Sequence, residues 1–155
     1  MADEDMPKKK QLLPPMYFVF AMALMVLLHF SLPIASWLPW PWRAGGVVLT
    51  IIGLGFNVVA DRQFKRHGTT IKPFQSSSVL VTDGIFGFSR NPMYLGMVLV
   101  LVGIGIVLAT IGPLALIPVF AWWITTRFVV PEEKDLTRQF GRAFIDYRSR
   151  VHRWL

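Results

Sequence analysis

The sequence predicts an all-α integral membrane protein with four transmembrane helices, a cytosolic loop and a C-terminal amphipathic interfacial helix. Residues 91–126 contain no Asp, Glu, Lys or Arg. Hydrophobic residues make up 54% of the 155-residue chain and charged residues only 16%, whereas about a quarter of a typical soluble domain is charged. Of the 16 Lys and Arg residues, all but Arg43 fall in three stretches that alternate with apolar runs. Such a pattern is typical of a chain that crosses a bilayer several times.

The first predicted span covers residues 14–32, after a cytosolic tail of residues 1–13. Its length matches the roughly 20 residues that a helix needs to cross a bilayer. Three lysines precede it, so a signal peptide is the competing interpretation. The apolar run is longer than a signal-peptide core, the tail begins with acidic residues and no clear cleavage site follows. We therefore expect a retained span within a single membrane domain over residues 14–155.

The second span is expected over residues 44–60, after a loop rich in tryptophan and proline. The charge-free run of residues 91–126 would form a helix of roughly 54 Å, while a bilayer core is only about 30 Å thick. The run must therefore contain parts of two spans, predicted at residues 91–109 and 113–130. Gly112-Pro113 provides a turn between them.

Charge placement predicts the orientation of these spans. The basic residues lie in the N-terminal tail, between residues 62 and 90, and after residue 126. By the positive-inside rule, these segments and both termini are cytoplasmic, which means the inner membrane if the cell is bacterial. A net charge of +7 also suits nucleic acid, but its distribution favours membrane lipids, and no nucleic-acid partner is expected.

An amphipathic pattern begins after the fourth span, over residues 131–148. Arginines alternate with apolar residues at spacings of three or four, namely Leu136, Phe140, Phe144 and Tyr147. This pattern predicts one helix lying at the membrane interface. Pro131 suits the first turn of that helix.

Arg90 stands at the entrance of the third span, directly before Asn91-Pro92. It follows a loop with two glycines, and Pro92 suits a helix start because it lacks an N–H group. Free backbone N–H groups at such a start suit an anion or a carboxylate-bearing ligand. An arginine at the end of a span can also extend to lipid headgroups. The residues alone leave both interpretations open.

The acidic pair Glu132 and Glu133 follows Arg127 by about one helical turn. These acids have a structural explanation, since negative charge near a helix start is favourable. A carboxylate beside the membrane also suits a bound cation or ribose hydroxyls. No metal site is expected, because the chain lacks Cys and its three histidines are scattered.

Two motifs bracket the charge-free run. The first consists of Gly68-Thr69-Thr70, Leu80-Val81-Thr82, Gly84, Phe86 and Arg90-Asn91-Pro92-Met93-Tyr94. The second consists of Glu132-Glu133, Leu136, Phe140-Gly141, Tyr147 and Arg150-Val151. In this order, around a helical hairpin, the motifs resemble the isoprenylcysteine carboxyl methyltransferase and phospholipid N-methyltransferase superfamily. Gly53-Leu54-Gly55 also resembles the Gly-x-Gly that phospholipid methyltransferases carry in an earlier span.

The resemblance implies S-adenosyl-L-methionine as the cofactor, bound at the cytosolic face, so that the loop before Arg90 becomes a cytosolic cofactor loop. The cofactor-binding residues that it implies are Ser78, Val79, Leu80, Val81, Phe86, Asn91, Pro92, Met93, Tyr94, Glu132 and Glu133. The first four form an extended segment beside the adenosine, and Phe86 forms an aromatic wall. The resemblance implies catalytic roles for Arg90 and Arg127, which would orient an anionic acceptor, and for Glu132, which would hold the cofactor.

The chain departs from the isoprenylcysteine enzymes at three positions. Ser78 and Asn91 stand where those enzymes have His, and Phe86 stands where they have Tyr. The Asn-Pro-Met-Tyr sequence is closer to the phospholipid branch. The acceptor therefore stays open between an isoprenylated thiol, a prenylated carboxylate and a lipid amine, that is, a lipophilic or lipid-modified substrate. The sequence does not indicate an oligomeric state.

Two other functions compete with methyl transfer. Membrane sterol reductases, which use NADPH, are similar in their C-terminal half. They are longer, and this chain lacks an evident extra basic cluster for the 2′-phosphate. The other alternative is a non-catalytic lipid-binding membrane module, in which the glycines and arginines only pack helices and contact headgroups.

Overall fold

The computed structural model describes residues 12–32, 38–68 and 79–155, which form helices and connecting turns without a β-strand. The elements in chain order are α1 (Pro14–Ser31), α2 (Trp40–Arg66), the 3-10 turn η1 (Gly84–Gly87), α3 (Pro92–Leu108), α4 (Ile111–Ile124), the π-helix η2 (Thr125–Val129), α5 (Val130–Phe140) and α6 (Arg142–Arg150). The all-helical class predicted from the sequence is confirmed. Ser78 and the segment from Thr69 onward that precedes it lie outside the described residues.

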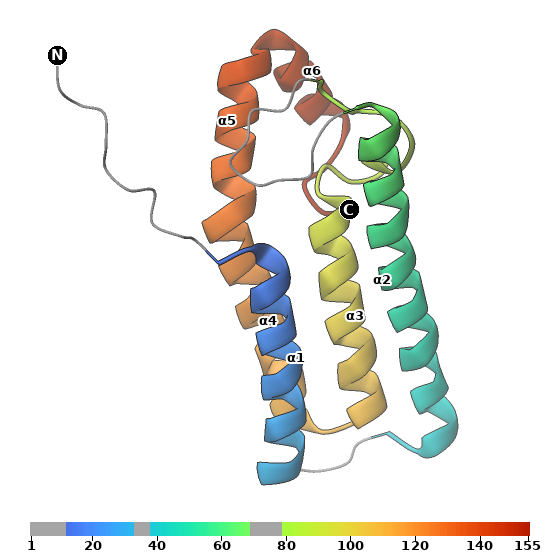
Figure 1. Cartoon of the computed structure of the whole chain (residues 1–155). Coiled ribbons are helices and arrows are strands. Elements are labelled where there is room, and N and C mark those ends of the chain that lie inside the picture. The colour runs from blue at the N-terminus through green and yellow to red at the C-terminus, as the bar shows by residue number, and fades with distance from the viewer. Residues whose placement is uncertain (1–11, 33–37, 69–78) are drawn as a thin grey trace, which may run out of the picture.

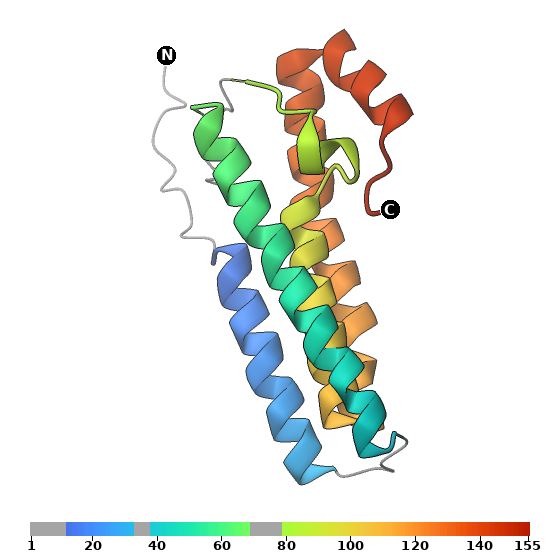
Figure 2. The ribbon, with the colours of Figure 1, turned by 90° about the vertical axis from the view of Figure 1, so that its right-hand side faces the viewer.

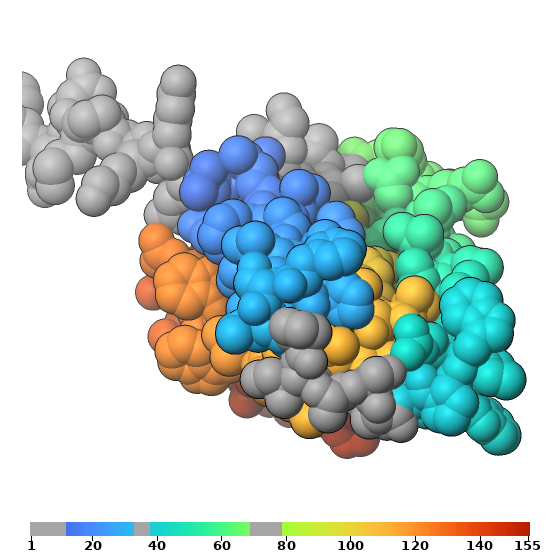
Figure 3. Space-filling model, turned by 90° about the horizontal axis from the view of Figure 1, so that it is seen from below, coloured from blue at the N-terminus to red at the C-terminus, as the bar shows by residue number. Residues whose placement is uncertain are grey.

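Helix α3 occupies the middle of the bundle. Helix α2 packs along one side of it, and α4 and α1 pack together on the other side (Figure 1). Seen from below, α3 is visible between α1 and α2, while α4 lies beside α1 (Figure 3). Helices α5 and α6 extend beyond the bundle at the end where α3 begins (Figure 2). The centre of one polar end is therefore occupied by the N-terminus of α3.

Glycines set the close packing of α2 against α3. An ideal Cβ on Gly53 would lie 2.7 Å from the carbonyl oxygen of Gly96 and 2.8 Å from the Val100 nitrogen. Gly46, which is nearer the start of α2, faces the Gly103 carbonyl oxygen in the same way. Small residues allow this approach of two backbones in membrane bundles. Gly55, by contrast, has no neighbour within 4 Å, so the two glycines of the Gly-x-Gly sequence face different surroundings.

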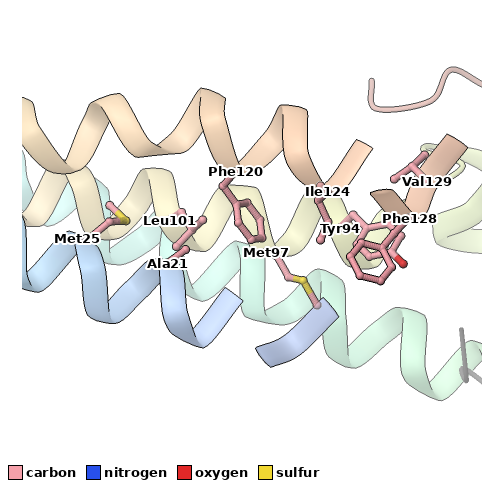
Figure 4. Packing of buried hydrophobic residues seen from close by; sticks show 9 residues of the cluster. All are labelled: Ala21, Met25, Tyr94, Met97, Leu101, Phe120, Ile124, Phe128 and Val129. Carbon is pink, nitrogen blue, oxygen red and sulfur yellow. The ribbon is translucent and has the colours of Figure 1, made fainter. Parts of the chain in front are cut away.

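A second packing region joins α1, α3, α4 and η2. Its buried residues are Ala21, Met25, Tyr94, Met97, Leu101, Phe120, Ile124, Phe128 and Val129 (Figure 4). Tyr94 and Phe128 lie at the end of this region nearest to the polar end of the bundle (Figure 4). The packing of this region therefore fixes the position of Tyr94 near the polar end of the bundle.

Three helical segments are long and apolar enough to cross a membrane: α1, α2 and the continuous helix Ile111–Phe140. Helix α3 is apolar but has only 17 residues, so the four-span count stays a prediction. Helices α1 and α3 begin and end close to the predicted limits, and so does α4 together with η2. Helix α2, by contrast, extends beyond residues 44–60 at both ends. Its last turns leave the apolar section and carry polar side chains toward η1.

The predicted interfacial helix over residues 131–148 is divided in two. Helix α5 ends at Phe140 and α6 begins at Arg142, because Gly141 between them has a positive φ of 52°. Glycine adopts this conformation without the steric penalty of a Cβ. Whether α5 and α6 lie at a membrane interface stays a prediction.

Helix α4 continues into α5 through a π turn. The Val130 N–H donates to the Thr125 carbonyl five residues earlier, which is the π-helical hydrogen bond. The following Pro131 has no N–H, and its ring would crowd the carbonyl four residues earlier in a regular α-helix. A wider turn relieves this conflict, and such turns are frequent at functional sites. The π turn therefore sets the direction of α5, which carries Glu132 and Glu133.

Candidate functional site

Four segments meet at the polar end of the bundle: η1, the start of α3, the start of α5 and the tail after α6 (Figures 1 and 2). The first and last of these segments are far apart in the chain, with Leu155 following Gly84 by 71 positions. Three of the segments bring polar side chains into this region, η1 contributes the Phe86 carbonyl, and hydrogen bonds join the segments in pairs. This region is the candidate functional site.

Helix α2 holds the turn that leads into η1. The Gln63 side-chain nitrogen donates to the Asp83 carbonyl over 2.7 Å, and its oxygen accepts from the Ile85 N–H over 3.2 Å. Gly84, between these two residues, has a φ of 53°, and a Cβ there would collide with the Gln63 side chain. The turn is therefore shaped by one glutamine and one glycine.

Phe86 is buried between α2 and α6. Its ring packs edge-on against Phe64 at a centroid distance of 4.8 Å. Its carbonyl accepts a 2.6 Å hydrogen bond from the Tyr147 hydroxyl, and burial raises the pKa of that hydroxyl to about 12. The phenol therefore stays a donor at neutral pH. Val81 belongs to the same buried cluster as Phe86.

Tyr94 and Glu132 form the first polar pair of the site. The hydroxyl of Tyr94, in the first turn of α3, donates to Glu132 Oε1 over 2.7 Å. Tyr94 is buried and Glu132 is partly buried. The described residues provide no hydrogen-bond partner for Glu132 Oε2. The pair joins α3 to α5 and leaves one carboxylate oxygen available to a ligand.

Glu133 points elsewhere and lies between two arginines. Arg153 Nη2 is 2.7 Å from Oε2 and Arg153 Nε is 3.1 Å from Oε1, so both carboxylate oxygens are engaged. Arg90 Nη2 is 3.4 Å from Oε1. The hydrogen bonds to Glu133 raise the pKa of the Arg153 guanidinium. The two adjacent acids thus have separate partners.

Arg90 is a buried cation with unused donors. Its side chain is 8% exposed, and its Nε and Nη1 atoms have no hydrogen-bond partner among the described residues. Burial lowers the pKa of the guanidinium, although Glu133 opposes that effect. Most buried polar groups in proteins are hydrogen-bonded. These two nitrogens therefore mark a place where an anionic ligand would be stabilised.

The chain after α6 closes the site from the other side. The Arg90 N–H donates to the His152 carbonyl over 3.0 Å, and the Asn91 side chain donates to the Arg153 carbonyl over 3.2 Å. The Ser89 hydroxyl, which is fully buried, also donates to the Arg153 carbonyl. The side chain of Asn91 is thus used to hold the tail.

The remaining predicted residues differ in exposure. Pro92 is buried, Met93 is partly buried against the Phe86 cluster and Leu80 is partly buried. Val79 is 41% exposed. Arg127 is exposed on η2 and takes no part in the Arg90–Glu133–Arg153 cluster.

The role of the tail after α6 does not follow from the sequence pattern. Arg153 lies 20 residues after Glu133, and no local spacing rule connects two residues this far apart. The spacing of Tyr147 predicts only the apolar face of a helix, whereas its hydroxyl donates to the carbonyl of Phe86. In the part of the chain that the structure describes, no three His, Asp or Glu side chains gather as metal ligands would.

Comparison with known proteins matches the chain over residues 42–143 to the family model described as phospholipid methyltransferase. A curated relative is the protein-S-isoprenylcysteine O-methyltransferase of Schizosaccharomyces pombe, 27% identical over 95 residues. The match covers 61% of this chain and 36% of that protein. The chain therefore spans about a third of the length of this relative.

The fold is similar to that of a solved eukaryotic intramembrane Ras methyltransferase, isoprenylcysteine carboxyl methyltransferase. The TM-score is 0.66 at 21% identity, over 92% of this chain and 52% of that one. This likeness and the long apolar helices identify the chain as an integral membrane protein. Since the family model matches most of the sequence, the chain belongs to the phospholipid methyltransferase family, in the superfamily that includes the isoprenylcysteine carboxyl methyltransferases.

Proposed function

We propose that the protein transfers a methyl group from S-adenosyl-L-methionine to a lipophilic acceptor at the cytosolic face of the membrane. The observation that supports this most is the pairing of Tyr94 with Glu132, together with the buried Arg90 at the same polar end of an apolar bundle. The family membership supports the reaction class. Charge placement in the sequence supports the cytosolic side.

The residues of the site fit the charges of this cofactor. It carries a sulfonium, an ammonium and a carboxylate, together with ribose hydroxyls. Glu132 keeps one oxygen free for a cation or a hydroxyl. Arg90 keeps two buried donors free for the carboxylate. The hydrophobic turn with Val81 and Phe86 lies nearby and supports the placement of the adenosine on that side.

When bound, the cofactor supplies an electrophilic methyl group, and attack by the acceptor leaves a neutral thioether. The reaction is an in-line displacement, so the residues mainly bind, orient and exclude water. Glu132 holds the cofactor and offsets its positive charge. If the acceptor is an amine, the proton released on methylation passes to Glu132, whose second oxygen is free.

The acceptor enters from the bilayer, with its apolar part among the helices. Arg127 is exposed where η2 leaves the apolar section, so it is placed to meet an anionic group of an acceptor at the membrane face. The S. pombe relative is named for isoprenylcysteine O-methylation, whereas the matching family model is named for phospholipids. Both a prenylated carboxylate or thiol and a lipid amine therefore remain acceptors to compare.

A methyl-transfer assay distinguishes the acceptors. The purified protein in liposomes receives labelled S-adenosyl-L-methionine with a farnesylated cysteine, with its methyl ester or with phosphatidylethanolamine. Labelling of the free cysteine derivative but not of its ester identifies a carboxylate acceptor, and labelling of phosphatidylethanolamine identifies an amine. A total membrane lipid extract serves as a fourth acceptor sample. No transfer to any of the four samples, despite binding of S-adenosylhomocysteine, would contradict the proposed reaction. The variant Glu132→Gln should lose most activity in every case.

A further inference from the structure

Two arginines lie beside the single carboxylate of Glu133, but they engage it unequally. Arg153 donates to both oxygens as a fork, through Nε at 3.1 Å from Oε1 and Nη2 at 2.7 Å from Oε2. Arg90 approaches only Oε1, through Nη2 at 3.4 Å, which is the distance of a looser ion pair. Forked arginine–carboxylate pairs are strong and fixed in direction. Glu133 is therefore committed to the tail rather than to Arg90.

The consequence for Arg90 is a guanidinium that is buried and only partly neutralised. Its side chain is 8% exposed, and Nε and Nη1 have no partner within the described ranges. Counting Glu133, Arg90 and Arg153 together, the cluster carries one carboxylate and two guanidinium groups. One positive charge is left in a protein-lined region, where an anion would complete it.

The position of Arg153 is built into the same turn that carries Arg90. The carbonyl of Arg153 accepts from the Asn91 side chain and from the buried Ser89 hydroxyl. The neighbouring His152 carbonyl accepts from the Arg90 N–H over 3.0 Å. The tail and the start of α3 are thus joined by three hydrogen bonds. Arg153 reaches Glu133 from a fixed anchor, and this arrangement is more than a chance contact of a long side chain.

We infer that Arg153 is a positioning residue: it holds Glu133 in a forked ion pair so that the donors of Arg90 stay available for the carboxylate of the cofactor. This inference rests on the proposed function. Without Arg153, Glu133 would turn its full charge to Arg90, which lies only 3.4 Å away. The internal carboxylate would then compete with the ligand for the same guanidinium.

The competing explanation is that Arg153 only fastens the tail to α5. The two explanations differ in what happens when Glu133 is also removed. If Arg153 only fastens the tail, a protein without both residues binds no better than one without Arg153. If Arg153 restrains a competitor, removal of that competitor restores binding. A double variant therefore separates positioning from simple stabilisation.

The test is isothermal titration with S-adenosylhomocysteine, which has the same amino-acid carboxylate, on the full chain in detergent. Arg153→Gln should weaken binding at least about tenfold, as expected for the loss of a charge-assisted contact. The double variant Arg153→Gln with Glu133→Gln should return to within about threefold of the wild type. Arg153→Lys, which keeps the charge but loses the fork, should lie between them. The matched control is Arg150→Gln, an exposed arginine near the same tail.

Several results would overturn the inference. One is wild-type affinity in Arg153→Gln. Another is a folded double variant that binds as weakly as the single one. If Arg153→Gln does not fold, Arg153→Lys with and without Glu133→Gln gives the same comparison, and equal affinities would contradict the proposal. Failure of the wild type to bind S-adenosylhomocysteine would contradict the proposed function itself, and the two failures are thus distinguishable.

Discussion

Replacement of Gly53 by alanine tests whether the contact between α2 and α3 is as close as the structure requires. The new Cβ would lie 2.7 Å from the Gly96 carbonyl oxygen and 2.8 Å from the Val100 nitrogen, both of them backbone atoms. Neither atom can rotate away, so the helices must separate. Overpacking of this kind typically costs about 1–3 kcal/mol. On the scale of soluble domains of this size, where about 1 kcal/mol moves Tm by about 2–4 °C, the expected fall in Tm is about 2–12 °C.

The control is Gly55→Ala, two residues further along the same helix. Its Cβ would meet nothing within 4 Å, while alanine is the better helix former, so its Tm should stay equal or rise slightly. Thermal unfolding of both variants in the same detergent, followed by tryptophan fluorescence, measures the difference. Equal Tm values for Gly53→Ala and Gly55→Ala would refute the proposed close packing, because the two changes differ only in their neighbours.

Three further substitutions test the site and its supports. Tyr94→Phe removes the 2.7 Å hydrogen bond to Glu132 and should lower the free energy of unfolding by about 1.5–3 kcal/mol, measured by thermal unfolding. Gly141→Ala should lower the free energy of unfolding by about 1–3 kcal/mol, because Gly141 has a φ of 52°. An unchanged Tm would mean that alanine adopts this conformation without strain. Gln63→Ala frees the turn at Gly84, so affinity for S-adenosylhomocysteine should fall while Tm changes little; unchanged affinity would remove this turn from the site.

The helices were predictable because their signals are local. A charge-free run, prolines at helix starts and the spacing of apolar residues depend only on neighbouring positions. Pro92 begins α3 as expected. The general position of the site also follows from sequence, since Tyr94 and Glu132 were both among the predicted cofactor residues and lie in contact. The cofactor roles of these residues stay predictions.

Long-range pairings were not predictable in the same way. Nothing in the spacing of Glu133 and Arg153 indicates that they meet, because their contact depends on the break at Gly141 and on the path of the tail. The π turn before Pro131 is a compromise between helix continuation and a missing N–H, and a residue pattern does not give its width. Glu132 and Glu133 are adjacent in the sequence, but the structure gives them different partners, Tyr94 and Arg153.

The glycines in α2 carry a signal that the sequence predictions did not use. Gly46 and Gly53 pack against α3, while Gly45 and Gly55 have open space. Thr50 and Asn57 are spaced three or four residues from Gly46 and Gly53, so these four residues share one face of the helix. Glycines in register with the polar residues of a span therefore indicate the packed face.

The most direct test of the methyltransferase account is titration of the purified wild type and Glu132→Gln with S-adenosylhomocysteine and, separately, with NADPH. The account predicts saturable binding of S-adenosylhomocysteine to the wild type, binding weakened at least about tenfold in Glu132→Gln, and no binding of NADPH. Binding of NADPH alone would indicate a reductase of the sterol type. A folded protein that binds neither compound would contradict the central claim and favour a lipid-binding module.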